Sequence, residues 1–282
     1  MNMIEQHSPA VTVCIPVYNC EQFVGSAIES VLIQSFTDFE LIILNNASTD
    51  NTAEVIRRYR DTRIRIIENE TNVGAAGNWN KALAVAHGKY LKIVCADDVL
   101  YPSCLARQVE ALEAPENSGV AMACCGRDVI NEKGTIIMNR NFRGQRGRIS
   151  GLAAVRKMVR NGTNFIGEPT AALFRTDVIP GTGGFNAALD YAIDFDYWCR
   201  LLVNRDLYVY PDSLSAFRVS ARSWSVAAAR SQSADVRMLI DQCARDRRYR
   251  LTTMDVLLGK GMSILNNVLR KIFYMLLLKK SA

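Results

Sequence analysis

Histidine is scarce in this sequence, which contains only His7 and His87. That scarcity argues against a zinc site built from several histidines. The eight cysteines form no CxxC pair and show no zinc-ligand spacing, and most of them lie in apolar stretches. We therefore expect reduced cysteines in the core of a cytosolic protein, and neither a metal cluster nor a disulfide framework.

Long apolar runs are missing as well. No run of the sequence approaches the ~20 residues that a membrane-spanning helix needs. Residues 1–10 contain neither a basic start nor an apolar stretch, so no secretory signal is expected. These absences favour a cytoplasmic protein.

The composition is that of a globular protein with a core. Hydrophobic residues make up 49% of the 282 residues and charged residues 22%. This length suits one large domain, or one domain with an appendage. The net charge of +6 suits an acidic ligand or an anionic membrane surface but requires neither. No nucleic-acid partner is expected.

The first half alternates apolar segments with helical patterns. A capping-box-like Asn51-Thr-Ala-Glu54, for example, predicts the start of a helix. Strands are predicted at 11–15, 39–44, 64–67 and 90–95, and helices at 21–34, 51–60 and 77–87. This alternation indicates βαβ units and a parallel sheet, whose polar strand-exit loops share one edge and can converge on a ligand.

The second half is less regular. A hairpin or exposed excursion is predicted at 128–147 and a flexible turn at 181–184. Strands are predicted at 120–125, 171–174, 207–210 and 214–219, and helices at 149–161 and 194–204. The pattern is helical from about residue 226 to the end. The predicted fold class is therefore α/β with a C-terminal helical segment.

Asp97 and Asp98 end the apolar segment at 92–96 with two adjacent carboxylates. Like charges repel, and burying them is costly unless a cation is present. A hard ion such as Mg²⁺ or Mn²⁺ takes one or two carboxylates together with phosphate oxygens. The pair therefore indicates either a metal–diphosphate site or a solvated turn that caps the next helix.

Several polar motifs after strands carry a family resemblance. In chain order they are Pro16-Val-Tyr-Asn19, Asn45-Asn-Ala-Ser-Thr-Asp50, the turn Asn72-Val-Gly74 before Asn78, Asp97-Asp98, the segments Phe165–Thr170 and Gly183–Phe185, and the acidic Asp194–Leu201. Their order and spacing resemble those of family 2 glycosyltransferases, which have the GT-A fold. The resemblance covers roughly residues 10–225.

The resemblance implies a GT-A domain over residues 1–225 with a mixed central sheet. Its Rossmann-like nucleotide-binding half would be 10–100 and its acceptor-binding half 101–225, with a helical extension at 226–282. The implied activity is the inverting transfer of one sugar from a nucleotide sugar to a hydroxyl of a glycan or lipid-linked acceptor, in surface polysaccharide biosynthesis. The family's processive polymerases carry a Gln-x-x-Arg-Trp motif that is missing here, which favours single transfers.

By the same resemblance, Asp194 is the catalytic base. An inverting transfer needs a carboxylate within hydrogen-bond reach of the acceptor hydroxyl, because that hydroxyl loses its proton. The alternative for Asp194 is a helix N-cap. Asp196 would point elsewhere on the helix and is the weaker candidate, and Glu168 is the other carboxylate to consider.

The resemblance also implies Mn²⁺ or Mg²⁺ held by Asp97 and Asp98, although Asp98 could instead bind the ribose, a metal-bound water or the sugar. Cys95 replaces an acid that the family often has, and Ser220 stands where a histidine is frequent. Arg218 and Arg222 are expected to clamp the diphosphate in compensation, or else to lie in a solvated loop.

The implied nucleotide pocket collects polar residues from the strand-exit loops. Asn45 stands where the family usually has an acid that accepts from uracil, and an amide can accept and donate. Uridine, thymidine and guanosine diphosphate sugars are therefore all candidate donors, uridine first. The alternative for Asn45 and Asn46 is simple turn chemistry. The remaining pocket residues would be Pro16, Tyr18, Asn19, Glu21, Asn72, Gly74, Asn78 and Lys81.

Residues 253–280 are apolar and basic, but their terminal apolar run, Ile272–Leu278, is too short to span a bilayer. Such a segment suits an amphipathic helix on an anionic membrane, a helix packed on the catalytic domain, or a homodimer contact. An alternative to the enzyme is a relative that binds nucleotide sugars without activity. Its support is the set of departures at Asn45, Cys95 and Ser220.

Overall fold

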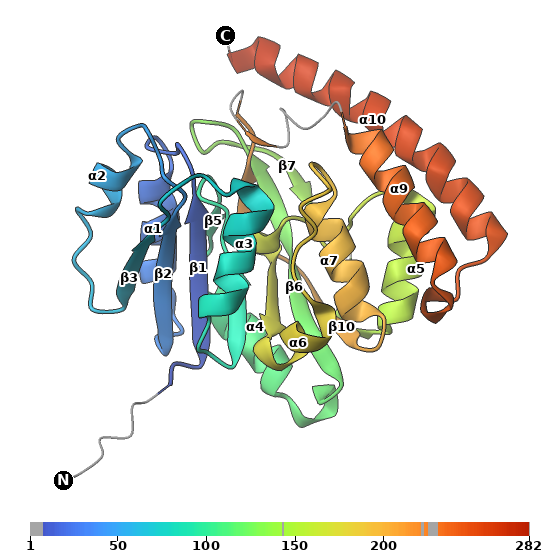
Figure 1. Cartoon of the computed structure of the whole chain (residues 1–282), viewed down its shortest axis with the longest axis horizontal. Coiled ribbons are helices and arrows are strands. Elements are labelled where there is room, and N and C mark those ends of the chain that lie inside the picture. Colours follow the sequence, from blue (N-terminus) through green and yellow to red (C-terminus); the bar gives the residue numbers. More distant parts are fainter. Residues whose placement is uncertain (1–7, 143, 221–222, 225–230, 282) are drawn as a thin grey trace.

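The computed structural model describes residues 8–142, 144–220, 223–224 and 231–281 (Figure 1). Arg222, predicted to clamp the diphosphate, lies outside the described residues. The described strands form a single ten-stranded mixed sheet with the order β3-β2-β1-β4-β9-β6-β10-β5, with β7 paired to β6 and β8 paired to β10. The strands are β1 (Val11–Val17), β2 (Phe39–Asn45), β3 (Ile64–Glu68), β4 (Tyr90–Ile93), β5 (Val99–Leu100), β6 (Val120–Ile130), β7 (Ile136–Arg140), β8 (Gly147–Ile149), β9 (Ala172–Arg175) and β10 (Asp206–Arg218).

Strand direction decides which loops meet. Strands β1 to β4 pair in parallel, and β6 pairs in parallel with β10. The two groups are joined through β9, which is antiparallel to both β4 and β6. The carboxyl ends of all six parallel strands therefore share one edge of the sheet, and β9 begins at that edge. We call it the strand-exit edge.

Alternating side chains of the strands feed two cores, one on each face of the sheet. In β1, Val11, Val13 and Ile15 pack into the core under α1 and α4, whereas Cys14 belongs to the core on the other face. The helices are α1 (Val24–Leu32), α2 (Thr52–Ile56), α3 (Gly74–Val85), α4 (Cys104–Glu113), α5 (Gly151–Asn161), α6 (Ile179–Thr182), α7 (Ile193–Leu202), α9 (Gln232–Arg245) and α10 (Thr253–Ser281).

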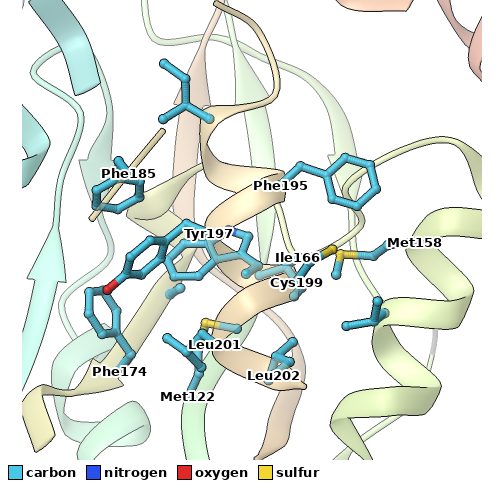
Figure 2. Close-up of a cluster of buried hydrophobic side chains, with 14 of the residues drawn as sticks. Met122, Met158, Ile166, Phe174, Phe185, Phe195, Tyr197, Cys199, Leu201 and Leu202 are labelled. Atoms are coloured by element: carbon cyan, nitrogen blue, oxygen red, sulfur yellow. The ribbon is translucent and has the colours of Figure 1, made fainter. Parts of the chain in front are cut away.

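An aromatic cluster fixes α7 against the sheet (Figure 2). Tyr197 stacks on Phe185 with ring centroids 4.0 Å apart, and Trp198 meets Phe174 of β9 edge-on at 5.7 Å. Both α7 rings are fully buried. Because large aromatic side chains dominate core energetics, this cluster sets the position of the first turn of α7, where Asp194 lies.

Helix α10 runs along α5 and α9 (Figure 1). The crossing with α5 is close, because a Cβ on Gly259 would come within 2.2 Å of the carbonyl oxygen of Val159. Asp255 anchors the first turn of α10 by accepting from Arg156 at 2.8 Å and from the Thr252 hydroxyl at 2.8 Å. No helix in the described part of the chain is both long enough and apolar enough to cross a membrane.

The sequence-based expectations for the elements were correct for most of the first half, although α4 was not predicted, and several boundaries in the second half were wrong. The predicted strands 207–210 and 214–219 are one strand, β10, interrupted by register shifts against β6. Strand β6 continues to Ile130 instead of ending at 125. The hairpin predicted within 128–147 is confirmed, because the end of β6 pairs antiparallel with β7. The predicted turn at 181–184 begins inside α6.

Candidate functional site

The strand-exit edge brings the predicted site residues together. Asn45 ends β2, Arg218 ends β10, and Asp97 and Asp98 follow β4. Glu168 and Thr170 precede β9, which starts at this edge because it runs antiparallel to its neighbours. The sequence predicted this convergence for the parallel strands, and the mixed sheet implied by the family resemblance is confirmed, but neither indicated that β9 would be the strand that adds residues from the opposite direction.

Asp98 is completely buried and both of its carboxylate oxygens have partners. One oxygen accepts from the Thr170 hydroxyl at 2.7 Å, and the other accepts from the backbone N–H of Arg218 at 2.9 Å. Burial, reinforced by the charge of Asp97, raises the pKa of Asp98 well above its ordinary value. Asp98 therefore joins the exits of β4 and β10 to the start of β9.

Asp97 is half-buried and faces the site more openly than Asp98. Its carboxylate accepts one long hydrogen bond, 3.4 Å, from the Ser223 hydroxyl. Burial raises the pKa of Asp97, and the charge of Glu168 acts in the same direction. Within the described residues no group of three or more His, Cys, Asp or Glu side chains could hold a metal, so an ion here would need oxygens from a ligand or water.

The guanidinium of Arg218 is buried and already hydrogen-bonded to the backbone. It donates to the carbonyl of Asp97 at 2.8 Å, and to those of Asn131 and Glu132 at 3.0 and 3.2 Å. It also lies 4.7 Å from the centre of the Phe23 ring. This arrangement braces the strand exits. The side chain of Ser220, which bonds Ser223, is likewise buried beside the site.

The loops after β1 and β2 interlock. The Asn19 amide donates to Thr49 and its oxygen accepts from the Thr49 backbone N–H, while Glu21 accepts from Asn51 and the backbone N–H of Glu21 donates to Asp50. The predicted capping box at Asn51 does not form, because Asp50 instead accepts from the backbone N–H at the start of α2.

The predicted wall residue Tyr18 is 46% exposed beside these loops. Pro16 lies in β1, next to Leu44 of β2, so it sits close to the strand exit. The interlocked loops thus form one rigid side of the pocket, with an exposed aromatic ring on it.

A network of amides forms the other side of the predicted nucleotide pocket, and its centre is Asn69, which was not predicted from the sequence. Asn69 donates to both Asn46 and Asn78, and it accepts from Lys81. Asn46 also accepts from the backbone N–H of Val73 and donates to Asn72. Gly74, at φ +75°, gives the turn a backbone conformation that few other residues adopt.

Asn45 is buried and its side chain is already paired. Its amide donates to Glu68 at 2.9 Å, and its oxygen accepts from the backbone N–H of Ser48 at 3.2 Å. The turn chemistry expected as the alternative is therefore present. Glu68, which ends β3 and also pairs with Arg57, places a half-exposed carboxylate next to Asn45.

Asp194 lies in the first turn of α7 and is half-buried. One carboxylate oxygen accepts from the Asn164 amide at 3.0 Å and the other from the Phe195 backbone N–H at 2.7 Å. Burial raises the pKa of Asp194 from 3.8 to about 7, and the negative charge of Glu168 adds to the effect. A carboxyl with this pKa can take up and release a proton near neutral pH.

Two further charged residues, Arg127 and Glu168, form a buried ion pair beside Asp194. Their closest atoms are 3.0 Å apart, and the second oxygen of Glu168 is buried with no hydrogen-bond partner among the described residues. Asp196, in contrast, points away and pairs with Arg200 at 2.6 Å. The geometry thus favours Asp194 over Asp196 as the residue that faces the site.

A cavity of about 610 Å³ opens next to this group. Its lining includes Arg127 and Asn164, residues of β7, α5 and α10, and residues of the segments 141–145 and 163–165. Asn164 connects the cavity to Asp194 through the hydrogen bond described above. The site therefore has an acidic centre, a hydrogen-bonded network of amides on the β2–β3 side and a large cavity on the α5–α10 side.

Comparison with known proteins shows which family and which relatives this chain resembles in sequence. The family model described as Glycosyl transferase family 2 matches residues 12–181. An uncharacterized Mycobacterium tuberculosis protein, MT1568, is 32% identical over 76% of this chain and 68% of its own length. The Escherichia coli UDP-Glc:alpha-D-GlcNAc-diphosphoundecaprenol beta-1,3-glucosyltransferase WfaP is 35% identical over 36% of this chain and 41% of its own length.

Solved structures agree on the fold. Staphylococcus aureus TarS 1–349 in complex with UDP-GlcNAc superposes with a TM-score of 0.70 over 91% of this chain and 72% of TarS, at 18% identity. The mannosyltransferase PcManGT from Pyrobaculum calidifontis, in complex with GDP-Man and Mn²⁺, gives 0.65 over 91% of this chain and 70% of its own, at 19% identity. Both likenesses concern the arrangement of the elements.

Proposed function

Because this chain belongs to glycosyl transferase family 2 and has the GT-A fold, we propose that it moves one sugar from a nucleotide-sugar donor to a hydroxyl of a glycan or lipid-linked acceptor, with inversion. The assignment to surface polysaccharide biosynthesis is part of the same proposal. It is supported by WfaP, whose name specifies a lipid-linked diphosphate acceptor.

The observation that carries the proposal is the convergence of three carboxylates. The segment of Glu168 contacts both aspartate loops: the Asn164 amide donates to the Gly167 carbonyl and to Asp194, and the Thr170 hydroxyl donates to Asp98, next to Asp97. The charge of Glu168 acts to raise the pKa of both Asp97 and Asp194. Asp97 comes from the segment 10–100 and Asp194 from 101–225, which supports the division into a donor half and an acceptor half. A donor and an acceptor held by these two halves would meet between Asp97 and Asp194.

Asp97 suits a divalent ion, Mn²⁺ or Mg²⁺. Among the described residues its half-buried carboxylate accepts one long hydrogen bond, from Ser223, and it lies beside a second acid, an arrangement that a bound cation would stabilise. When bound, the ion would neutralise charge that develops on the leaving diphosphate. Asp98, predicted as a second ligand, has both oxygens occupied, so its role in this proposal is to hold the loop of Asp97 in place.

Asp194 would act on the acceptor. Its deprotonated carboxylate takes the proton of the acceptor hydroxyl as the oxygen bonds to the anomeric carbon and the bond from that carbon to the diphosphate oxygen breaks. The Asn164 amide and the Phe195 N–H orient the carboxylate for this step.

The amide network around Asn69 and the interlocked loops would hold the nucleoside. We propose a uridine diphosphate donor, with thymidine and guanosine diphosphate sugars as the alternatives to compare. TarS in complex with UDP-GlcNAc and PcManGT in complex with GDP-Man represent two of these bases. Lys81 reaches this neutral network from α3 and would place a positive charge next to it.

An inactive nucleotide-sugar-binding relative is the second candidate. It is favoured by the absence of a three-residue metal cluster within the described chain and by Cys95 at a place where the family often has an acid. The two candidates differ in turnover. Only the enzyme releases free sugar from a nucleotide sugar when Mn²⁺ is present.

The test is titration of UDP with and without Mn²⁺ by calorimetry, followed by hydrolysis assays on several nucleotide sugars. Asp97→Ala is expected to abolish the Mn²⁺-dependent part of UDP binding without unfolding the protein, because within the described part of the chain this carboxylate accepts a single long hydrogen bond of 3.4 Å. Asp177→Ala is the matched control, since Asp177 is exposed and follows β9 at the opposite edge of the sheet. Unchanged Mn²⁺-dependent affinity in Asp97→Ala would refute the metal role.

We also propose that the exposed face of α10 rests on an anionic membrane at the cytoplasmic side. Large apolar residues repeat along that face at helical spacing, and the exposed members include Leu257, Leu265 and Val268. Lys271 is exposed next to this stripe. A homodimer through the same face is the competing arrangement, and sedimentation measurements distinguish the two.

A further inference from the structure

The cavity beside Asp194 has a strongly positive lining. Arg140 of β7, Lys157 of α5 and Arg270 of α10 line it together with the ion-paired Arg127. No acidic side chain is among the described residues that line it. A neutral sugar would not require this charge, whereas a diphosphate is recognised by converging arginine and lysine side chains.

The same cavity also has apolar residues in its lining, and on α10 they alternate with the polar Asn266 and Arg270. Leu269 and Phe273 of α10 line it, and Phe142 faces them from the segment after β7. The Phe142 ring meets the Phe165 ring edge-on at 5.9 Å. A ligand that fills this cavity therefore needs an apolar part next to its anionic part.

The apolar wall continues onto the surface of α10. Leu269 is 54% exposed, and Leu265, Val268 and Ile272 are between 46% and 49% exposed. These four residues follow the i, i+3, i+4, i+7 spacing that places them on one side of the helix. A lipid chain that leaves the cavity thus has a continuous apolar track along α10.

From these three observations we infer that the cavity binds the diphosphate of a lipid-linked acceptor, with its lipid chain along α10 and its sugar directed past Asn164 toward Asp194. The inference rests on the proposed function and narrows it, because it selects a prenyl diphosphate-linked sugar over a free glycan. Arg140, Lys157 and Arg270 would bind the diphosphate. The hydrogen bond of 3.0 Å between Asn164 and Asp194 joins this binding site to the base.

Farnesyl diphosphate without any sugar is the probe for this site. Titration is done in EDTA, so that the probe does not bind through a metal at Asp97. We expect binding to wild type, and about tenfold or greater weakening in Arg270→Gln and in Lys157→Gln, since each loses a charge-assisted hydrogen bond. Arg58→Gln is the matched control, because Arg58 is an exposed arginine just after α2, at the far end of the molecule from α10 (Figure 1).

Two comparisons test the lipid part. Affinity is expected to rise from citronellyl to farnesyl to geranylgeranyl diphosphate, and this rise is expected to be lost in Leu265→Ser. Inorganic pyrophosphate that binds as tightly as farnesyl diphosphate would overturn the assignment of the lipid chain to α10. Because Lys157 is exposed, Lys157→Gln is expected to fold. It therefore still tests the diphosphate site if Arg270→Gln does not fold.

The result for the acceptor cavity can be told apart from the result for the proposed function. Each variant is also titrated with UDP and Mn²⁺, and unchanged UDP affinity is expected because these residues lie on the acceptor side. Wild type that binds UDP but not farnesyl diphosphate would overturn this inference and leave glycosyl transfer standing. Equal farnesyl diphosphate binding by wild type, Arg270→Gln and Lys157→Gln would overturn it as well.

Discussion

At the scale of single residues, the environment of Asp194 determines how the protein should respond to pH. Burial raises its pKa from 3.8 to about 7, so a large part of this carboxyl is protonated in a neutral solution. A base acts only when it is deprotonated. In the proposed role of Asp194 as the base, activity therefore depends on proton binding by this one group.

We expect kcat/KM for sugar transfer to fall by about tenfold for each pH unit below 7 and to level off above it, as for a single ionising base. Asp194→Asn is expected to lose about 10²- to 10⁴-fold in turnover while it still binds UDP. Initial rates across a pH series measure both effects. Near-normal turnover of Asp194→Asn would transfer the role of base to Glu168 or Asp196.

Asp196→Asn is the matched control for this prediction. Asp196 is buried and paired with Arg200, so its loss should lower the melting temperature but leave the pH profile in place. The raised pKa of Asp194 also determines how the stability of the fold changes with pH. The folded state holds the Asp194 proton more tightly than the unfolded state between pH 3.8 and about 7, so this group lowers stability as pH rises through that window.

Sequence reasoning identified the carboxylates at this scale but not their partners. Asp97 and Asp194 were predicted from motifs, and the structure places both at the strand-exit edge. The sequence offered less to indicate that Asn69, Arg127 and Glu168 belong to the site. Asn69 follows β3 in a loop without a distinctive motif, and the Arg127–Glu168 pair joins residues that only tertiary packing brings together.

At the scale of elements, the crossing of α5 and α10 depends on glycine. A Cβ on Gly259 would overlap the Val159 carbonyl, and Gly162, at φ +55°, packs against the backbone of the same part of α10. These contacts bring α10 close enough to line the cavity. The helical pattern after residue 226 predicted that a helix exists here, but it could not indicate which neighbour the helix would pack against.

Gly259→Ala is expected to destabilise the protein by about 1–3 kcal/mol, because the backbone of α5 cannot give way as a flexible side chain would. Gly261→Ala is the opposite case in the same helix. A Cβ added at Gly261 would meet open space, so the change to alanine should stabilise the helix by up to about 1 kcal/mol. Chemical denaturation of both variants checks the pair. Equal effects in the two would refute the close crossing.

Strand β10 shows where element-level prediction fails. Pro211 and Asp212 interrupt the apolar pattern and suggest a turn between two strands. In the structure the chain passes this point with shifts in register between Tyr210 and Ser215, and pairing with β6 resumes beyond it. Tertiary pairing thus overrides the local turn signal.

At the scale of the whole molecule, the stripe on α10 predicts how the protein meets a surface. We expect it to sediment with vesicles that contain phosphatidylglycerol and less with vesicles of phosphatidylcholine alone, and binding should weaken as salt is added. Leu265→Glu should reduce the bound fraction. Ile33→Glu is the control, since Ile33 is 63% exposed just beyond α1 on another part of the molecule.

Equal sedimentation of wild type and Leu265→Glu would contradict membrane contact through α10. A concentration-dependent dimer that Leu265→Glu dissociates would assign the stripe to a homodimer instead. The overall fold itself was the most predictable feature, because alternating strands and helices with polar exits leave few arrangements of a parallel sheet. The antiparallel insertion of β9 was beyond that reasoning.

The hydrogen bond from the backbone of Arg218 to buried Asp98 has a consequence for how the protein is made. Asp98 lies near the end of the segment 10–100, yet one of its buried carboxylate oxygens is paired with a residue 120 positions later in the chain. A chain still on the ribosome before β10 emerges would have to leave that oxygen unpaired, at a cost that disfavours the finished loop. We therefore expect the loop of Asp97 to take its final form only after Arg218 has been synthesised.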